Sequence, residues 1–151
     1  MKRKFRFRLE SVENVRRSKE QECMRLLAQA QSRYHQALNF KSELLQALEN
    51  ALVRRERLSE AAQSILAYRV ENDFILGTKQ RIVQADQFIF KAKKHVEKAL
   101  KTFLDARRAT RAIEMLREKA YEEFKLDLRK REQKELEDLY VMRARMNKES
   151  A

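Results

Sequence analysis

Apolar residues recur every three or four positions through the first third of the chain, which is the spacing of one face of an α-helix. Four charged residues, Arg16, Lys19, Arg33 and Arg54, interrupt this row, and their aliphatic stems can cover a helix contact while their charged ends reach water. A row this long predicts a helix that packs along its length on another helix. The row consists of Leu9, Val12, Cys23, Leu26, Ala30, Ala37, Phe40, Leu44, Ala47, Ala51 and Leu58, and a neighbouring row adds Leu27, Tyr34, Leu45, Leu48 and Leu52.

The second half of the chain repeats the pattern on a single stripe. Alanine alternates there with larger residues, as closely approaching helices require, because small positions receive the side chains of the partner helix. The stripe comprises Ile82, Ala85, Ile89, Ala92, Val96, Ala99, Phe103, Ala106, Thr110, Ile113, Ala120 and Phe124. Leu136, Leu139, Met142 and Met146 continue an apolar face near the C-terminus.

The N-terminal stretch KFRFRL alternates basic and apolar residues, which is the period of a half-buried strand. The rest of the sequence offers no second strand for it to pair with. A targeting peptide is poor in acidic residues, and Glu10 and Glu13 follow at once. The remaining interpretation is a helix start in which Phe5, Leu9 and Val12 share one face, which leaves Phe7 free to meet a partner.

Two positions could reverse the chain. Ser64 could cap a helix that starts at Ile65, because its hydroxyl can accept a hydrogen bond from a free N–H of the first turn. The stretch ENDFILGTK contains Gly77, the only glycine, and glycine readily ends helices. The residues alone leave both positions open.

Composition favours long helices over a layered domain. The 151 residues include 1 Gly, 0 Pro and 38% charged residues, so the residues that turns need are nearly missing. Yet 43% hydrophobic residues exceed what disordered chains carry. We therefore expect an all-α fold, an elongated antiparallel two-helix hairpin forming one coiled-coil domain over residues 1–151. An unbroken helix pairing with a second chain is the alternative, but both halves carry complementary stripes.

The formal net charge of +12 bears on partners, because nucleic acid, an acidic membrane face and an acidic protein cavity would all attract it. The basic clusters are spread along the chain instead of forming one stripe, which argues against nucleic acid. Acidic residues neutralise part of the charge, as in the i,i+4 pair of Glu13 and Arg17. Cys23 is the single cysteine, and no apolar run approaches a membrane span, so a cytoplasmic protein is expected.

Catalytic and metal-binding patterns are missing from the sequence. His35 and His95, the only histidines, have no Cys, Asp or Glu at the spacing of a helical metal motif. Paired carboxylates such as Glu122 and Glu123 sit among basic residues on solvated helix faces, and a two-helix rod does not supply the buried setting that general acid–base catalysis needs. We expect no enzyme activity, no cofactor and no metal.

Two segments together resemble a known family. KFRFRLESVENVRRSKEQECMRLL is similar to the N-terminal signature of the FliJ family, the coiled-coil component of the bacterial flagellar type III export apparatus. AIEMLREKAYEEFKLDLRKREQKELEDLYVMR is similar to the C-terminal segment of that family. The resemblance covers essentially the whole chain and implies a hairpin similar to the central stalk of rotary ATPases, with a role in motility and chemotaxis. The stalk proteins of virulence type III secretion are the nearest confusable group.

The resemblance also implies partners. Family members bind the hexameric export ATPase and promote both the assembly of its ring and its hydrolysis of ATP. They also contact the cytoplasmic domain of the export gate membrane protein, and some recycle export chaperones. The protein would then be peripheral at the inner-membrane face of the flagellar basal body. The ATPase contact maps to Phe5, Phe7, Leu9, Arg131, Leu136 and Leu139. The gate contact maps to Phe40, Leu44, Ala47, Ala51, Phe74 and Thr78, although the family often has aromatic residues where Ala47 and Ala51 stand and an apolar residue at Thr78.

The turn follows from the same resemblance. Family members reverse before the aromatic-apolar pair that Phe74 and Ile75 match, which favours the earlier position. The sequence thus predicts a first helix over about residues 4–59, a turn over about 60–64 and a second helix over about 65–146, with a turn at 72–78 as the alternative. Nucleic-acid binding by a basic coiled coil remains the alternative function.

Overall fold

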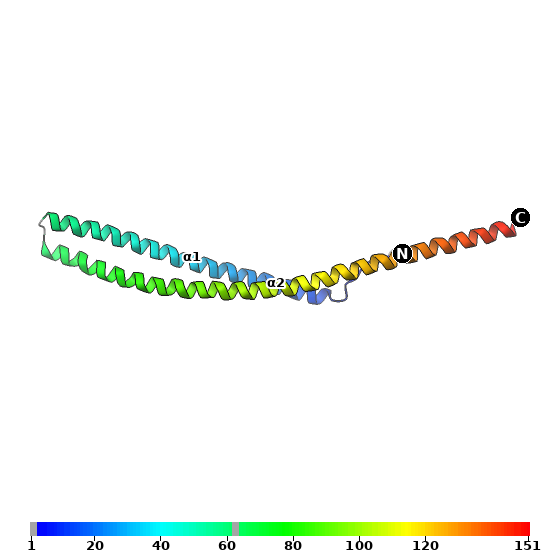
Figure 1. Cartoon of the computed structure of the whole chain (residues 1–151), viewed down its shortest axis with the longest axis horizontal. Helices are drawn as coiled ribbons and strands as arrows, with labels where there is room; N and C mark the ends of the chain where they lie inside the picture. Colours follow the sequence, from blue (N-terminus) through cyan, green and yellow to red (C-terminus); the bar gives the residue numbers. More distant parts are fainter. Residues whose placement is uncertain (1–2, 62–63) are drawn as a thin grey trace. The chain divides into compact units, whose positions relative to one another are not determined.

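Two long helices make up nearly the whole protein. The structure, a computed structural model, describes residues 3–61 and 64–151. Helix α1 spans Glu10–Glu60 and helix α2 spans Ile65–Glu149, and they pack against each other in opposite directions (Figure 1). The described residues are 93% helical and contain no strand. The predicted all-α helical hairpin is therefore confirmed.

The chain divides into two compact units, each built from a part of both helices. The first unit combines Met1–Glu20 with Ala106–Ala151, and the second consists of Gln21–Asp105. The units are described separately below. The interface between α1 and α2 within each unit is called the seam.

The seam of the second unit follows a strict three-and-four spacing. Its buried side chains include Cys23, Leu27, Leu44 and Ala51 on α1 and Ile75, Thr78 and Ala85 on α2. Ala51 is completely buried and Ala85 is 2% exposed, so the small residues lie where the helices approach closely. The predicted stripe on α2 is confirmed along its length, because each of its members is buried or half-buried.

The predicted row on α1 is wrong at several positions. Val12, Leu26 and Phe40 are exposed by 38%, 44% and 52%, whereas Leu27 and Leu48 of the neighbouring row lie in the seam. Both rows keep a helical spacing, and only the opposing helix decides which of them is covered. The seam on α1 also includes charged residues, which a search for apolar residues alone does not detect.

The N-terminus also differs from the prediction, which began the first helix at about residue 4. Residues 3–7 have no regular structure, Arg8 and Leu9 form a turn, and the Glu10 amide donates to the Phe7 carbonyl over 3.3 Å. Helical geometry would place Phe5 and Phe7 on opposite sides of the helix, so only one could face α2. The acidic Glu10 and Glu13 instead occupy the first turn, where the helix dipole favours negative charge.

Ser64 caps the second helix as its position predicts. Its Oγ accepts a hydrogen bond from the Leu66 amide over 3.2 Å, and its carbonyl accepts from the Tyr68 amide over 3.2 Å. Two residues of the expected turn, 62 and 63, lie outside the described residues. Residues 72–78, the alternative turn position, lie within α2, and Gly77 is part of that helix.

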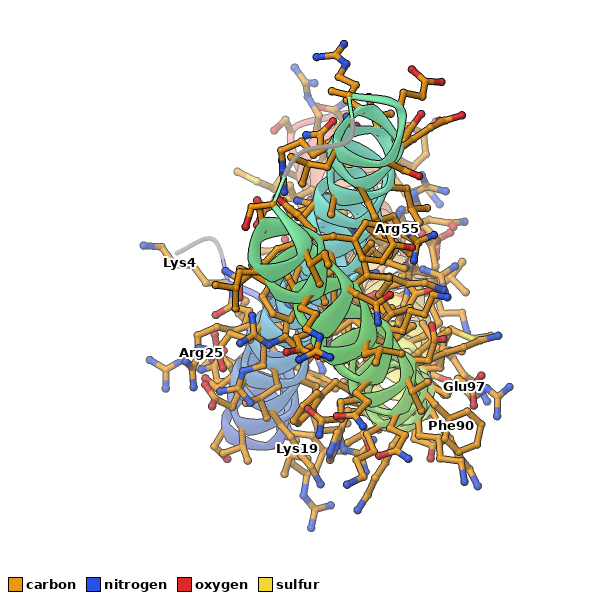
Figure 2. The ribbon with its side chains drawn as sticks, turned by 90° about the vertical axis from the view of Figure 1, so that its left-hand side faces the viewer. Lys4, Lys19, Arg25, Arg55, Phe90 and Glu97 are labelled. Atoms are coloured by element: carbon orange, nitrogen blue, oxygen red, sulfur yellow. The ribbon has the colours of Figure 1, made fainter. Side chains whose placement is uncertain are left out.

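Ion pairs and hydrogen bonds flank the seam of the second unit. Arg54 pairs with Glu71 at 2.8 Å, and Lys41 pairs with Asp86 at 2.6 Å. Figure 2 shows charged side chains such as Arg25 and Glu97 pointing outwards, and Phe90 pointing outwards among them. Phe90 is 59% exposed, with the Lys94 ammonium 4.5 Å from its ring centroid. The helices therefore have narrow apolar seams and largely charged outer faces.

Candidate partner-binding site

The N-terminal segment, residues 3–9, packs on α2 in the first unit. The Phe5 ring meets the Tyr121 ring edge-on, with centroids 5.2 Å apart and planes at 71°, and it lies 5.5 Å from the Phe124 ring. Phe7 is buried, and the Arg117 guanidinium lies 5.9 Å from its ring centroid. The expectation that Phe7 stays unpacked is therefore wrong. Its side chain anchors the segment, and the exposed basic residues beside it face outwards.

An open hollow of about 1050 Å³ lies between this segment and α2. Phe5, Phe7 and Leu9 contribute to its lining, so the structure brings together the three N-terminal residues expected at the site. The other lining residues are Arg3, Lys4, Arg6 and Arg8 on the segment and Leu116, Ala120, Glu123, Phe124 and Asp127 on α2. An apolar floor with charged rims of both signs suits the binding of a protein surface.

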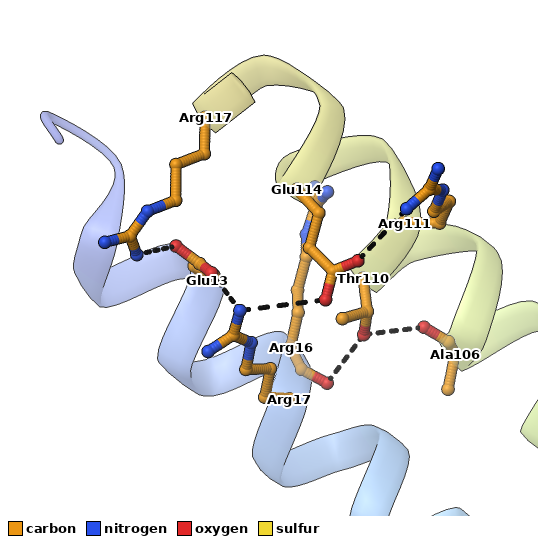
Figure 3. Close-up of polar contacts among 8 residues, drawn as sticks. All are labelled: Glu13, Arg16, Arg17, Ala106, Thr110, Arg111, Glu114 and Arg117. Atoms are coloured by element: carbon orange, nitrogen blue, oxygen red, sulfur yellow. Dashed lines mark hydrogen bonds and ion pairs between the residues drawn. The ribbon is translucent and has the colours of Figure 1, made fainter. Parts of the chain in front are cut away.

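A buried carboxylate fastens the start of α1 to α2 (Figure 3). Glu13 is completely buried, and its Oε2 accepts a hydrogen bond from Arg117 Nη1 over 2.8 Å. Arg17 Nη2 lies 2.5 Å from Oε1, yet Oε1 accepts no hydrogen bond of good direction, so the contact there is an ion pair. The hydrogen bond and the charge of Glu13 raise the pKa of Arg117 above its ordinary value.

The same cluster includes backbone atoms of both helices. Arg16 Nη1 donates to the Ala109 carbonyl over 2.9 Å. The Thr110 hydroxyl lies 3.2 Å from the Arg16 carbonyl and 3.1 Å from the Ala106 carbonyl, so its one proton serves either acceptor (Figure 3). Arg16 is half-buried, so its guanidinium binds the opposing helix in addition to the water contact that the sequence predicts. Glu114 lies on the rim, 3.7 Å from Arg17.

This cluster positions the N-terminal segment and does not resemble a catalytic centre. Glu13 is held between Arg17 and Arg117, whose positive charges offset its own. Within residues 3–61 and 64–151, no group of three or more His, Cys, Asp or Glu side chains could hold a metal ion. The apolar pattern placed Thr110 on the α2 stripe but missed Glu13 as an interhelical contact. The seam spacing of three and four residues, followed back from Cys23 through residues 20 and 16, leads to Glu13, so this spacing could have predicted its place in the seam.

The C-terminal part of α2 carries the other expected ATPase contacts. Every residue from 129 onwards is exposed, including Arg131. Leu136 and Leu139 are 67% and 62% exposed. Leu136 follows Phe124 by twelve residues, which is about 18 Å along a helix. The six expected residues thus fall into two separate groups, the N-terminal hollow and an exposed length of helix.

The residues expected at the export gate differ in access within the second unit. Phe40 and Phe74 are 52% and 42% exposed and could meet a partner directly. Ala47 is half-buried, while Leu44, Ala51 and Thr78 are buried. Thr78 donates its hydroxyl proton to the Phe74 carbonyl over 2.7 Å, which explains how the helix accepts a polar residue there. The buried three stabilise the seam and offer little surface to a partner.

The two exposed aromatic residues of the gate set, Phe40 and Phe74, do not form one patch either. The ion pairs place Arg54 beside Glu71 and Lys41 beside Asp86, so Phe74 lies near the level of residue 51, eleven residues from Phe40 along α1. Eleven residues of helix correspond to about 16 Å. A partner that touches both side chains would therefore have to extend along the helices.

These features define a coiled-coil hairpin whose accessible side chains are apolar and charged. A family model described as the flagellar FliJ protein matches residues 5–149, so the chain belongs to the FliJ family. The resemblance seen in the two terminal segments is thereby confirmed. This is a non-catalytic family of flagellar, export-related coiled-coil proteins. No match was found among curated proteins or among solved structures. None of the described helices has the length and apolar character that a bilayer crossing requires.

Proposed function

We propose that the protein is a non-enzymatic stalk of the flagellar type III export apparatus that binds the hexameric export ATPase. The observation that carries this proposal is the exposed apolar length of α2 beyond Phe124, with Leu136 and Leu139 more than 60% exposed and basic residues such as Arg131 beside them. Monomeric soluble proteins rarely leave such a row uncovered without a binding role. Family membership supports the flagellar apparatus over a virulence secretion system.

The N-terminal hollow contributes to the same contact in this proposal. Its rim carries Arg3, Lys4, Arg6 and Arg8, which would meet acidic side chains of the ATPase subunits and accelerate their encounter. Phe7 acts indirectly, because it is buried and holds the basic segment on α2. Binding at the centre of the hexamer promotes ring assembly by mass action, since it stabilises only the assembled state.

The proposed link to the export gate uses exposed side chains of the second unit. Phe40 and Phe74 supply aromatic surface, and aromatic residues are enriched where proteins bind each other. The protein would work in the cytoplasm, held at the inner-membrane face of the basal body only through these partners. Recycling of empty export chaperones is a further activity that the same exposed surfaces could support.

ATPase stimulation tests the proposal. Wild-type protein should raise hydrolysis by the cognate export ATPase and shift it towards hexamers. Leu136→Ala with Leu139→Ala should require roughly tenfold more protein for half-maximal stimulation, which corresponds to a loss of about 1.4 kcal/mol shared by the two truncated side chains. Leu45→Ala, an exposed leucine on α1, is the matched control and should stimulate normally. Hydrolysis and assembly that do not respond to the wild-type protein would reject the ATPase contact.

A further inference from the structure

The exposed end of α2 carries a row that is complementary to itself. Positions 132, 136, 139, 143 and 146 follow the three-and-four spacing of a coiled-coil seam, yet no part of α1 covers them. We call this the C-terminal row: Glu132, Leu136, Leu139, Arg143 and Met146. Tyr140 and Met142 flank it and are 77% and 62% exposed. The row is therefore one face of an unpartnered helix.

Apart from Met146, the row has two leucines at its centre and one charged residue at each end, and the two end residues have opposite charges. An acidic residue, two leucines and a basic residue follow one another at spacings of four, three and four. When two copies of such a helix run in opposite directions, the residue numbers of facing positions have a constant sum. With Leu136 facing the partner's Leu139, the same alignment places Glu132 opposite the partner's Arg143.

We propose that the C-terminal row pairs with the same row of a second copy of this chain in an antiparallel dimer. Two-fold symmetry repeats each contact, so the pairing contains two leucine layers at its centre and a Glu132–Arg143 layer at each end. A parallel pairing in register would place Glu132 beside the partner's Glu132 and Arg143 beside the partner's Arg143. Like charges then oppose each other at both ends, which selects the antiparallel arrangement.

The interface is short. Positions 132 to 146 span about 21 Å of helix, so each copy buries only a few apolar side chains. The dimer is therefore weak, with a dissociation constant on the order of 100 µM, as expected for small and transient interfaces. Leu136 and Leu139 are also the residues of the proposed ATPase contact, so dimer and ring-bound states exclude each other. The dimer itself needs no ATPase and does not rest on that proposal.

Sedimentation equilibrium of the full chain without any ATPase tests the pairing. Glu132→Arg places two arginines opposite each other in each end layer, and Arg143→Glu places two glutamates opposite each other, so each variant alone should associate roughly tenfold more weakly than wild type. A mixture of the two variants should regain affinity through mixed dimers, because one end layer of the mixed dimer pairs two native residues and the other pairs the two introduced ones, and both layers are attractive. The chain that carries both substitutions should also regain wild-type affinity.

Matched substitutions off the row provide the control. Glu137→Arg and Arg145→Glu make the same charge changes on the outward side of the helix and should leave the association unchanged. Far-UV circular dichroism should show equal helicity for all variants, because every changed side chain is exposed. Wild-type protein that stays monomeric at about 1 mM, or association that ignores the charge reversals, would overturn the proposal.

Discussion

Replacing Glu13 by glutamine tests whether the buried carboxylate stabilises the hairpin. The substitution keeps the shape of the side chain and removes its charge. Glu13 is completely buried, whereas Arg17 and Arg117 are 50% and 41% exposed, so both cations can regain water when the carboxylate is lost. The loss is therefore confined to the buried partner and its hydrogen bond.

The expected cost follows from that geometry. A hydrogen bond to a charged group contributes about 1.5–3 kcal/mol to stability, and rehydration of the arginines places Glu13→Gln at the low end, about 1.5–2 kcal/mol. For a chain of this length, each kcal/mol shifts Tm by roughly 2–4 °C, so the variant should melt about 3–8 °C lower. Thermal unfolding followed by far-UV circular dichroism measures the shift.

An exposed glutamate provides the matched control. Glu22 is 55% exposed and pairs with Arg25 through two hydrogen bonds of 3.1 and 2.5 Å. Glu22→Gln makes the same chemical change where water screens the charge, so its effect should be small and should vanish as salt rises to about 1 M. The effect of Glu13→Gln should persist in salt. Equal melting of wild type and Glu13→Gln, or equal salt sensitivity of the two variants, would refute the reasoning.

Further substitutions probe single features. Gly77→Ala should stabilise the protein by about 1 kcal/mol, because an added Cβ meets no atom within 4 Å and glycine is unfavourable inside a helix; lower stability in chemical unfolding would contradict this. Phe7→Ala should accelerate tryptic cleavage of the basic N-terminal segment, since the segment loses its buried anchor, and an unchanged rate would show that other contacts hold it. Ser64→Ala should cost about 1 kcal/mol and Ser64→Gly only a few tenths, and calorimetry that finds equal losses would argue against the cap. Arg25 lowers the pKa of Glu22 below its ordinary 4.5, so the pair stabilises the fold above that value, and this stabilisation is lost as pH falls through the lowered pKa. Glu22→Gln should therefore make the stability of the protein depend slightly less on pH in the acid range. The same acid unfolding curve for wild type and variant would contradict the pairing.

The fold could be predicted from the sequence because the stripe on α2 contains few ambiguous positions. Large apolar residues such as Ile82, Ile89 and Phe103 alternate with alanine, so only one face can be buried. On α1 the seam passes through Glu13, which the apolar pattern assigns to solvent. Which of two neighbouring rows is covered depends on the opposing helix, and a single helix pattern does not contain that information.

The candidate site was predictable in location but not in detail. The aromatic and basic start of the chain marked the N-terminal segment as unusual, and the structure places it against α2. The burial of Phe7 depends on the segment leaving helical geometry at residues 3–7, which local propensity does not dictate. In the gate set, Leu44, Ala51 and Thr78 carry the helical spacing that makes them buried, whereas the family resemblance mapped a partner contact onto these positions without regard to burial.

The three-and-four repeat of the seam has a consequence for how the helices are aligned. A uniform apolar repeat allows one helix to slide by seven residues and still bury a similar seam, so apolar packing alone specifies alignment weakly. A slide of seven residues along α2 would exchange Arg117 for Thr110 or Phe124 opposite Glu13, leaving a buried charge without its hydrogen-bonded cation. An uncompensated buried charge is strongly destabilising. The Glu13 cluster therefore specifies the alignment of the two helices, because it destabilises slipped pairings of the first unit more than it stabilises the correct one.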